Sequence, residues 1–122
     1  MIAIDRIDHL VLTVSGSKTA AAEYERNFGL KATTAAMNER YYAFLKVGET
    51  TIAIVGPIPP EPGPVTGGLW GLAFHSADLD ATIAHLEKAG VTLKPPHRAQ
   101  QGGHITGLPL PLGGIQIAFI GE

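Results

Sequence analysis

Two histidines, His9 and His75, are the residues of this sequence best suited to acid–base chemistry. An imidazole changes charge near neutral pH, so two histidines in one pocket can act as proton donor and proton acceptor. Each also has a structural interpretation: His9 as a ring bonded to neighbouring backbone or to Asp8, and His75 as a core or rim histidine with no chemistry. We take both as candidate catalytic residues and leave the structural interpretation open.

Four further side chains could orient a ligand. Trp70 can stack on a planar ligand, and Gln116 can hydrogen-bond to a carbonyl or hydroxyl group. Arg98 and His104 flank a polar, glycine-containing stretch that could cover a bound molecule, and Arg98 could pair with a carboxylate or phenolate. The alternatives are a core or interface tryptophan, a solvent-facing glutamine and an ordinary hairpin loop.

Alternation along the first β-rich segment, residues 7–14, determines which of these side chains share a face. Leu10, Leu12 and Val14 fall on one face, whereas His9 and Thr13 fall on the other with Val11. The first face is apolar and suits packing against a helix. The second face carries polar groups and is the one expected to meet a ligand.

The same pattern of elements follows in both halves of the chain. The first half predicts a strand over 7–14, a helix over 17–27, and strands over 30–36, 41–47 and 51–55. The second half predicts a strand over 72–76, a helix over 78–88, and strands over 91–94, 105–108 and 115–120. Tyr41 and Tyr42 open a strand and must face opposite sides, and we take Tyr41 as the ligand-facing candidate.

The two halves also align residue by residue. A shift of 62 places Leu10 on Leu72 and Ala21 on Ile83, which are helix-packing positions in both halves. A shift of 65 places Gly48-Glu-Thr-Thr-Ile-Ala-Ile-Val-Gly56 on Gly113-Gly-Ile-Gln-Ile-Ala-Phe-Ile-Gly121. Constant shifts within elements indicate a duplication. We therefore predict a single domain over 1–122, with module one at about 4–56, a Pro-rich spacer at 57–68 and module two at about 69–121.

Composition limits the partners of the protein. A net charge of −2 offers no basic surface for nucleic acid or an anionic membrane. No apolar run is long enough to span a bilayer, and Asp5, Arg6 and Asp8 interrupt the first residues, so we expect a cytoplasmic protein. The absence of cysteine removes disulfides and thiolate metal sites, so that a metal would need His, Asp or Glu ligands.

Four segments carry a resemblance to a known family: Ile7-Asp-His-Leu-Val-Leu-Thr-Val14, Asp78-Leu-Asp80, Ala89-Gly-Val91 and the paired final strands. The sequence resembles the glyoxalase/bleomycin-resistance/extradiol-dioxygenase (vicinal oxygen chelate) superfamily over nearly its whole length. This resemblance implies an α+β fold of two tandem βαβββ modules, forming curled mixed sheets around a cleft. In that family, the inner faces of the first and fourth strands of each module offer ligands to a divalent metal.

Carried over to this sequence, the four ligand positions of the family are His9, Ala53, Gly71 and Ala118. Only His9 can bind a metal, whereas stable catalytic sites use about three protein ligands. We therefore expect no cofactor and a metal-free cleft, with His9 as the single ligand if a metal site exists. The alternative is a divalent-metal lyase or dioxygenase with atypical ligands such as Glu49 and His104.

The residues expected to line the cleft are mostly small and apolar, which favours a cavity for an organic molecule. The expected ligand-binding set is Thr13, Tyr41, Thr51, Ala53, Trp70, Gly71, Ala73, Arg98, His104, Gln116 and Ala118. Small residues could instead allow close packing of the sheets. The leading interpretation is a glyoxalase-like protein that binds a small apolar or aromatic molecule.

The alternative to a binding protein is a metal-independent enzyme. An isomerase, lyase or ring-opening enzyme would use His9 and His75 as acid and base. Exposed strand edges at the module ends also predict a homodimer, because pairing between chains would cover those edges.

Overall fold

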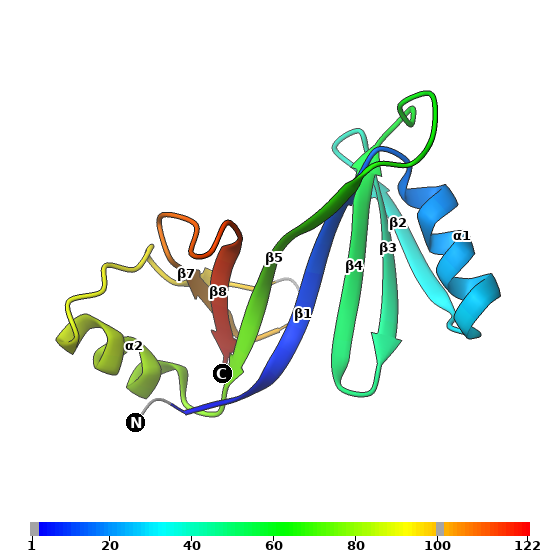
Figure 1. Cartoon of the computed structure of the whole chain (residues 1–122). Coiled ribbons are helices and arrows are strands. Elements are labelled where there is room, and N and C mark those ends of the chain that lie inside the picture. The colour runs from blue at the N-terminus through cyan, green and yellow to red at the C-terminus, as the bar shows by residue number, and fades with distance from the viewer. Residues whose placement is uncertain (1–2, 100–101) are drawn as a thin grey trace. The chain divides into compact units, whose positions relative to one another are not determined.

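A computed structural model describes residues 3–99 and 102–122 (Figure 1). In order, its elements are β1 (Ile4–Val14), α1 (Ser17–Phe28), β2 (Ala32–Met37), β3 (Arg40–Val47), β4 (Thr50–Pro57), β5 (Gly67–Ser76), α2 (Leu79–Lys88), β6 (His97–Arg98), β7 (His104–Gly107) and β8 (Gln116–Gly121). Within the described residues, the predicted α+β class is confirmed as two helices and a mixed sheet of eight strands. None of the described helices is long and apolar enough to cross a membrane.

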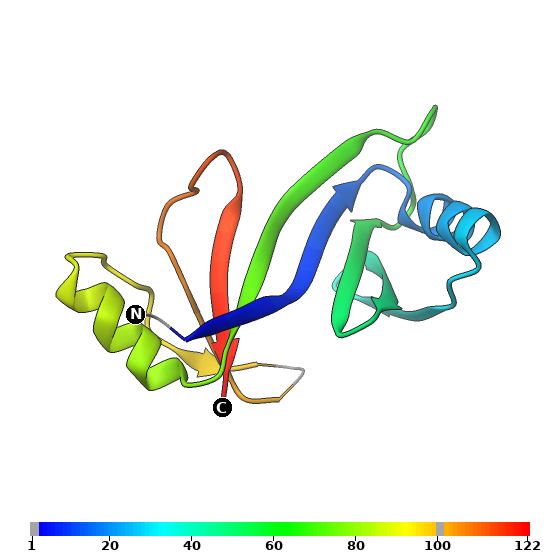
Figure 2. The same cartoon turned by 60° about the horizontal axis from the view of Figure 1, so that its bottom comes forward.

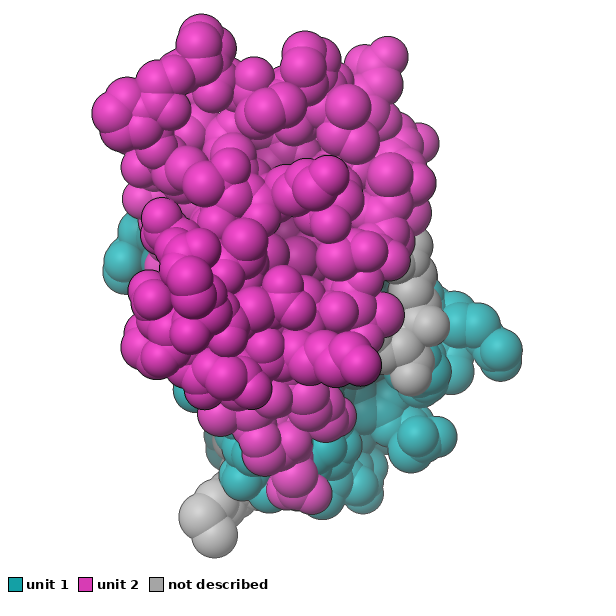
Figure 3. Space-filling model, turned by 90° about the vertical axis from the view of Figure 1, so that its right-hand side faces the viewer, with its two compact units in different colours: residues 1–8, 71–122 teal, residues 9–70 magenta. Residues whose placement is uncertain are grey.

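The chain divides into two compact units, coloured separately in Figure 3. Unit 2 comprises residues 9–70, and unit 1 comprises residues 1–8 and 71–122. The strands of unit 2 lie in the order β2-β3-β4-β1, and those of unit 1 lie in the order β5-β8-β7-β6. The strands β1 and β5 each contribute one segment to each unit.

The core of unit 2 lies between α1 and the sheet, where α1 packs on β3 and β4 (Figures 1 and 2). Alternation points Leu12 of β1 and Ile54 of β4 toward α1, where Ala21 is buried at 4% exposure. The helix ends at Gly29, whose φ of +70° suits a left-handed cap. Phe28, the last residue of α1, is 67% exposed and forms an edge-type aromatic contact with Tyr24, with ring centroids 5.6 Å apart.

The core of unit 1 is built in the same way around α2, which packs on β8. The Asp78 side chain accepts a hydrogen bond from the backbone N–H of Ala81 (3.1 Å), which caps the start of α2. The buried residues of this core are Leu79 of α2 and Ile117 and Phe119 of β8. The apolar stripe of the predicted helix therefore faces the last strand, as its spacing indicated.

The two parallel strand pairs have equivalent registers. In unit 2, Val11 of β1 lies opposite Ala53 of β4, and in unit 1, Ala73 of β5 lies opposite Ala118 of β8. The shifts of 62 and 65 assign Ala73 to Val11 and Ala118 to Ala53. Every other partner pair of the two ladders follows the same rule, so the register agrees with the predicted repeat residue by residue.

Both β4 and β8 have a glycine near their end, Gly56 and Gly121, and the structure explains both in the same way. A Cβ added to Gly56 would lie 2.6 Å from the carbonyl oxygen of Val14, and one added to Gly121 would lie 2.6 Å from that of Ser76. The repeat also relates Val14 to Ser76 by the shift of 62. In both units, therefore, the last strand lies in close contact with the final residue of its parallel partner strand, β1 or β5.

Two expectations from the sequence were wrong. No strand is found over 91–94, and β6 lies instead at His97–Arg98. Pro95 and Pro96 have no N–H group to donate to a neighbouring strand, and Leu93 packs in the core beside α2. The described strands also form an open sheet with β2 and β6 at its ends, instead of the expected curled sheets.

Candidate functional site

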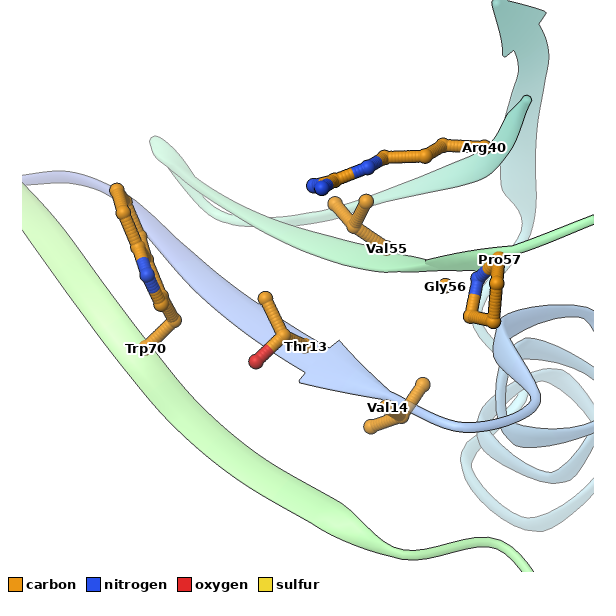
Figure 4. A pocket seen from close by; sticks show the side chains of 7 residues that line it. All are labelled: Thr13, Val14, Arg40, Val55, Gly56, Pro57 and Trp70. Atoms are coloured by element: carbon orange, nitrogen blue, oxygen red, sulfur yellow. The ribbon is translucent and has the colours of Figure 1, made fainter. Parts of the chain in front are cut away.

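Unit 2 contains a pocket with a volume of about 320 Å³, which we call the Trp70 pocket. It is lined by Thr13, Val14, Arg40, Val55, Gly56, Pro57 and Trp70. Figure 4 shows the Arg40 side chain extending over Val55 toward the side of the pocket where the indole of Trp70 stands. The pocket therefore combines a cationic group, an aromatic face and an apolar floor.

Two parallel strands form the floor of the Trp70 pocket. Thr13 of β1 is the ladder partner of Val55 of β4, and both point away from the face covered by α1. Val55 is 6% exposed and presents only apolar atoms, whereas Thr13 adds one hydroxyl group. The floor can thus hold an apolar ligand body and still accept or donate one hydrogen bond.

Arg40 is placed by the tight turn between β2 and β3. Asn38 and Glu39 form this turn with φ values of 52° and 60°, the left-handed pair that two-residue hairpins use. The carbonyl of Glu39 also accepts a hydrogen bond from the N–H of Ile58 (2.9 Å). Arg40 is therefore the first residue of β3 and lies opposite Pro57 of β4, at the rim of the pocket.

Trp70 is placed by the first residues of β5. Ser15 forms three hydrogen bonds with the backbone of the Pro-rich spacer. Its Oγ accepts from the N–H of Thr66 (2.8 Å), and its N–H donates to the carbonyl of Thr66 (2.8 Å). Its own carbonyl accepts from the N–H of Glu61 (2.9 Å). Gly67 follows, and a Cβ there would lie 2.1 Å from the carbonyl oxygen of Thr13. These contacts hold the backbone that leads to Trp70, which is 51% exposed.

The chemistry of the Trp70 pocket favours a ligand that is both planar and anionic. A guanidinium keeps its charge at any physiological pH and forms paired hydrogen bonds with a carboxylate or a similar oxyanion. Among the described residues, no carboxylate lies within ion-pair distance of Arg40. The exposed indole of Trp70 offers a stacking surface for a flat apolar group.

Sequence reasoning chose Tyr41, but the structure places its side chain against the core beside α1. Tyr42 is the ladder partner of Val55, so Tyr42 rather than Tyr41 shares the face of the Trp70 pocket. The Tyr42 ring stacks on that of Phe44, with centroids 6.1 Å apart and planes inclined by 12°. Arg40 precedes Tyr42 by two residues on β3 and therefore lies on the same face. Strand alternation starting from Tyr42 could have identified Arg40 as a pocket residue.

Three other candidates of unit 2 lie further along this face. His9 is the ladder partner of Thr51, and both are half-buried. Ala53 is 8% exposed and lies between Thr51 and Val55 on β4. A catalytic role of His9 stays a prediction, since its proposed partner His75 belongs to unit 1.

In unit 1, His75 has a defined partner that the sequence did not reveal. Its Nδ1 lies 2.7 Å from Oδ1 of Asp5. Arg6 lies beside both neighbouring carboxylates, at 3.7 Å from Asp5 and 4.0 Å from Asp8. The hydrogen bond with His75 is the main cause that lowers the pKa of the Asp5 carboxyl below 3.8, and the charges of His75 and Arg6 lower it further.

Asp5 should therefore titrate below pH 3.8 in the folded protein. Because its pKa is lower in the folded than in the unfolded state, ionised Asp5 stabilises the fold above pH 3.8, and this stabilisation is lost as the pH falls through the folded pKa. A carboxyl ¹³C NMR titration should show the Asp5 midpoint moving up toward 3.8 in His75→Leu. His85→Leu, on the exposed side of α2, is the control. Equal midpoints in His75→Leu and the wild type would contradict the assignment.

The small residues expected to leave room in unit 1 are instead packed. Ala73 is fully buried in a cluster with Ala99 and Ile120, against which Ile105 and Ala118 also pack. This result agrees with the close-packing alternative for these positions. The space that the sequence suggested beside Ala73 is therefore occupied by protein, whereas Ala118 is only partly buried.

The remaining candidates of unit 1 lie at strand ends. A Cβ on Gly71 would lie 2.6 Å from the carbonyl oxygen of Gln116, its ladder partner, so Gly71 allows close approach of two backbones. Arg98 and His104 are exposed ladder partners of the hairpin formed by β6 and β7. Part of the stretch expected to cover a ligand, residues 100–101, lies outside the described residues.

The ligand set that the family resemblance implies does not match a metal site here. Ala53 and Ala118 carry no donor atom, and the space beside Gly71 is taken by the backbone of Gln116. Among residues 3–99 and 102–122, no three His, Asp or Glu side chains come together as metal ligands. We therefore derive no reaction step through a metal.

Comparison with known proteins agrees with this fold. The sequence matches the Glyoxalase/Bleomycin resistance protein/Dioxygenase superfamily over residues 6–119. No curated protein matches the sequence.

Similar solved structures include methylmalonyl-CoA epimerase from Mycobacterium tuberculosis, at 21% identity and a TM-score of 0.77, with 100% of this chain and 91% of that chain covered. Methylmalonyl-CoA epimerase of Streptomyces coelicolor in complex with 2-nitronate-propionyl-CoA has 23% identity and a TM-score of 0.74, with 98% of each chain covered. A hypothetical protein from Bacillus halodurans has 21% identity and a TM-score of 0.74, with 96% and 94% covered. The match over residues 6–119 shows that the chain belongs to the Glyoxalase/Bleomycin resistance protein/Dioxygenase superfamily.

Proposed function

We propose that this protein binds a small molecule with a flat apolar body and one oxyanion in the Trp70 pocket, without a metal. The observation that carries this proposal is the pairing of Arg40 and Trp70 over the apolar side chain of Val55 in one pocket of unit 2. Arg40 would bind the oxyanion, and Trp70 would stack on the flat body. Thr13 would contribute one hydrogen bond.

The size of the pocket supports a small ligand. Its volume of about 320 Å³ is close to the lower end of the range for pockets that bind drug-sized ligands, about 300–1,000 Å³. A ligand of one or two rings suits this volume. The ligand class proposed from the sequence, a small apolar or aromatic molecule, is thereby extended by an anionic group.

The similar solved structures are consistent with an anionic ligand. Methylmalonyl-CoA epimerases have been solved in complex with methylmalonyl-CoA and with 2-nitronate-propionyl-CoA, which carry a carboxylate or a nitronate beside a thioester. At 21–23% identity these proteins share the fold with this chain, so the choice of ligand rests on Arg40 and Trp70.

Trp70 is the single tryptophan of the chain, so its fluorescence reports directly on the pocket. We expect benzoate to change Trp70 emission saturably. Benzyl alcohol, which has the same ring but no charge, should bind about tenfold more weakly, because a hydrogen bond to a charged group contributes more than a neutral one. The absence of a saturable change with benzoate, or equal affinity for both probes, would overturn the proposal.

A further inference from the structure

Unit 1 contains a second pocket, with a volume of about 190 Å³, which we call the His75 pocket. It is lined by Arg6, Asp8, His75, Gly102, Ile120, Gly121 and Glu122. All of these residues belong to unit 1, so the pocket is defined independently of the Trp70 pocket and of the function proposed for it.

The internal repeat makes the two pockets equivalent. The shift of 62 that relates β1 to β5 assigns His75 to Thr13, and the shift of 65 that relates β4 to β8 assigns Ile120 to Val55. In each unit, these two residues are ladder partners and line the pocket. The next residue of the last strand is a lining glycine in both pockets. The His75 pocket thus occupies the strand positions in unit 1 that the Trp70 pocket occupies in unit 2.

The two equivalent pockets differ in charge. In the Trp70 pocket the charged residue is Arg40. The His75 pocket has Asp8 and Glu122 in its lining and Asp5 bound to His75, against the single guanidinium of Arg6, which lies beside two of these carboxylates. An excess of carboxylates disfavours anions. The ligand of the His75 pocket must therefore differ in class from that of the Trp70 pocket.

The contact with Asp5 determines the tautomer of His75. An ionised carboxylate has no proton to donate, and the pKa of Asp5 is lowered, so Asp5 is an acceptor at neutral pH. The nitrogen 2.7 Å away, Nδ1 of His75, must then be the donor. In the neutral ring this leaves the lone pair on Nε2, which makes the other side of the ring a hydrogen-bond acceptor.

We propose that the His75 pocket is a second small-molecule site, in which Nε2 of His75 accepts a hydrogen bond from an uncharged ligand with an O–H or N–H group. Asp5 is the positioning residue that fixes the ring and its tautomer. Ile120 supplies apolar contact, as Val55 does in the equivalent pocket. The duplication has therefore produced two sites of opposite preference: one for oxyanions and one for neutral hydrogen-bond donors.

The role of Asp5 is tested by the tautomer of His75. Long-range ¹H–¹⁵N NMR distinguishes a protonated Nδ1 from a protonated Nε2, and we expect the Nδ1–H form in the wild type at a pH where the ring is neutral. Asp5→Leu should increase the Nε2–H form, because the acceptor is lost. A predominant Nε2–H form in the wild type would overturn the assignment, as would unchanged ¹⁵N shifts in Asp5→Leu.

The site itself is tested with phenol, anisole and benzoate as probes. We expect phenol to shift the amide resonances of Asp8, Gly102 and Gly121. Anisole, which lacks the O–H group, should bind about three- to tenfold more weakly, as the loss of one neutral hydrogen bond implies. Benzoate should leave these resonances unchanged and shift those around Trp70.

Two variants complete the test. His75→Leu should weaken phenol binding to the level of anisole, whereas Arg40→Gln, in the other pocket, should leave phenol binding unchanged. Equal binding of phenol and anisole to the wild type would overturn the proposal even if His75→Leu failed to fold. Phenol shifts centred on Trp70 would likewise overturn it, and benzoate binding around Trp70 could still support the proposed function.

Discussion

Replacing Gly56 with alanine is expected to destabilise unit 2 by roughly 3 kcal/mol, the upper end of typical overpacking costs. The new Cβ would lie 2.6 Å from the carbonyl oxygen of Val14, and 2.9 and 3.0 Å from Oγ and N of Ser17. Backbone atoms of β1 and α1 cannot move aside as the end of a flexible side chain can. Relief of this overlap requires β4 to separate from the start of α1.

Urea unfolding followed by Trp70 fluorescence measures this effect, because Trp70 belongs to unit 2. Gly68→Ala is the matched control, since a Cβ at Gly68 has no atom of another residue within 4 Å apart from those of its chain neighbours. The control should change stability by less than about 1 kcal/mol, the backbone effect of a compatible Gly→Ala change. If Gly56→Ala lost no more free energy of unfolding than Gly68→Ala, the end of β4 would not be closely packed against β1 and α1.

Replacing Arg40 with glutamine is expected to weaken benzoate binding by about 10- to 150-fold. This range corresponds to the 1.5–3 kcal/mol that a hydrogen bond to a charged group typically contributes. Glutamine keeps a polar group at the rim but removes the charge and the paired N–H groups of the guanidinium. The apolar floor formed by Val55 is unchanged, so benzyl alcohol should bind the variant as it binds the wild type.

The control for Arg40→Gln is Lys46→Gln, a loss of positive charge at the other end of the same strand. Lys46 is exposed, lies opposite Thr51, and is on the same face of β3 as Arg40. Trp70 fluorescence titrations should show unchanged benzoate affinity in Lys46→Gln. If both variants lost affinity equally, the net charge of the protein rather than a guanidinium in the pocket would account for binding.

The sequence predicted both helices, most of the strands and the equivalence of the two halves because all three depend on local patterns. Alternation in β1 and β5 and the helical spacing of Ala21 and Ile83 specify which faces are buried. The retained pair Gly56 and Gly121 marks a backbone contact that the sequence could indicate only as an identity. The physical reason for this identity is the close contact with the carbonyl oxygens of Val14 and Ser76.

The sequence could not predict contacts between distant segments. Asp5 and His75 are 70 residues apart, and nothing in the local pattern of either strand indicates their 2.7 Å contact. Arg40 was missed for another reason: Tyr41 instead of Tyr42 was taken as the ligand-facing residue, so the alternation was assigned to the wrong face of β3. Trp70 was proposed from its residue type, because an indole can stack on a planar ligand, and its role as a ligand contact stays a prediction.

Several expectations stay predictions. They include the metal-free cleft, the catalytic role of His9 with His75, the homodimer, and the lack of nucleic-acid or membrane partners. The division into two sequence modules joined by a spacer likewise stays a proposal.

Because β1 and β5 each contain residues of both units, the two units cannot be separated by cutting the chain once. Residues 9–70 form unit 2, so β1 gives its second segment to unit 2 and its first to unit 1, while β5 does the reverse. A single cut in the spacer would therefore yield two fragments, neither of which contains a whole unit. The N-terminal fragment would lack Trp70, and the C-terminal fragment would lack Asp5. Both pockets depend on an uncut chain, although each is built within one unit.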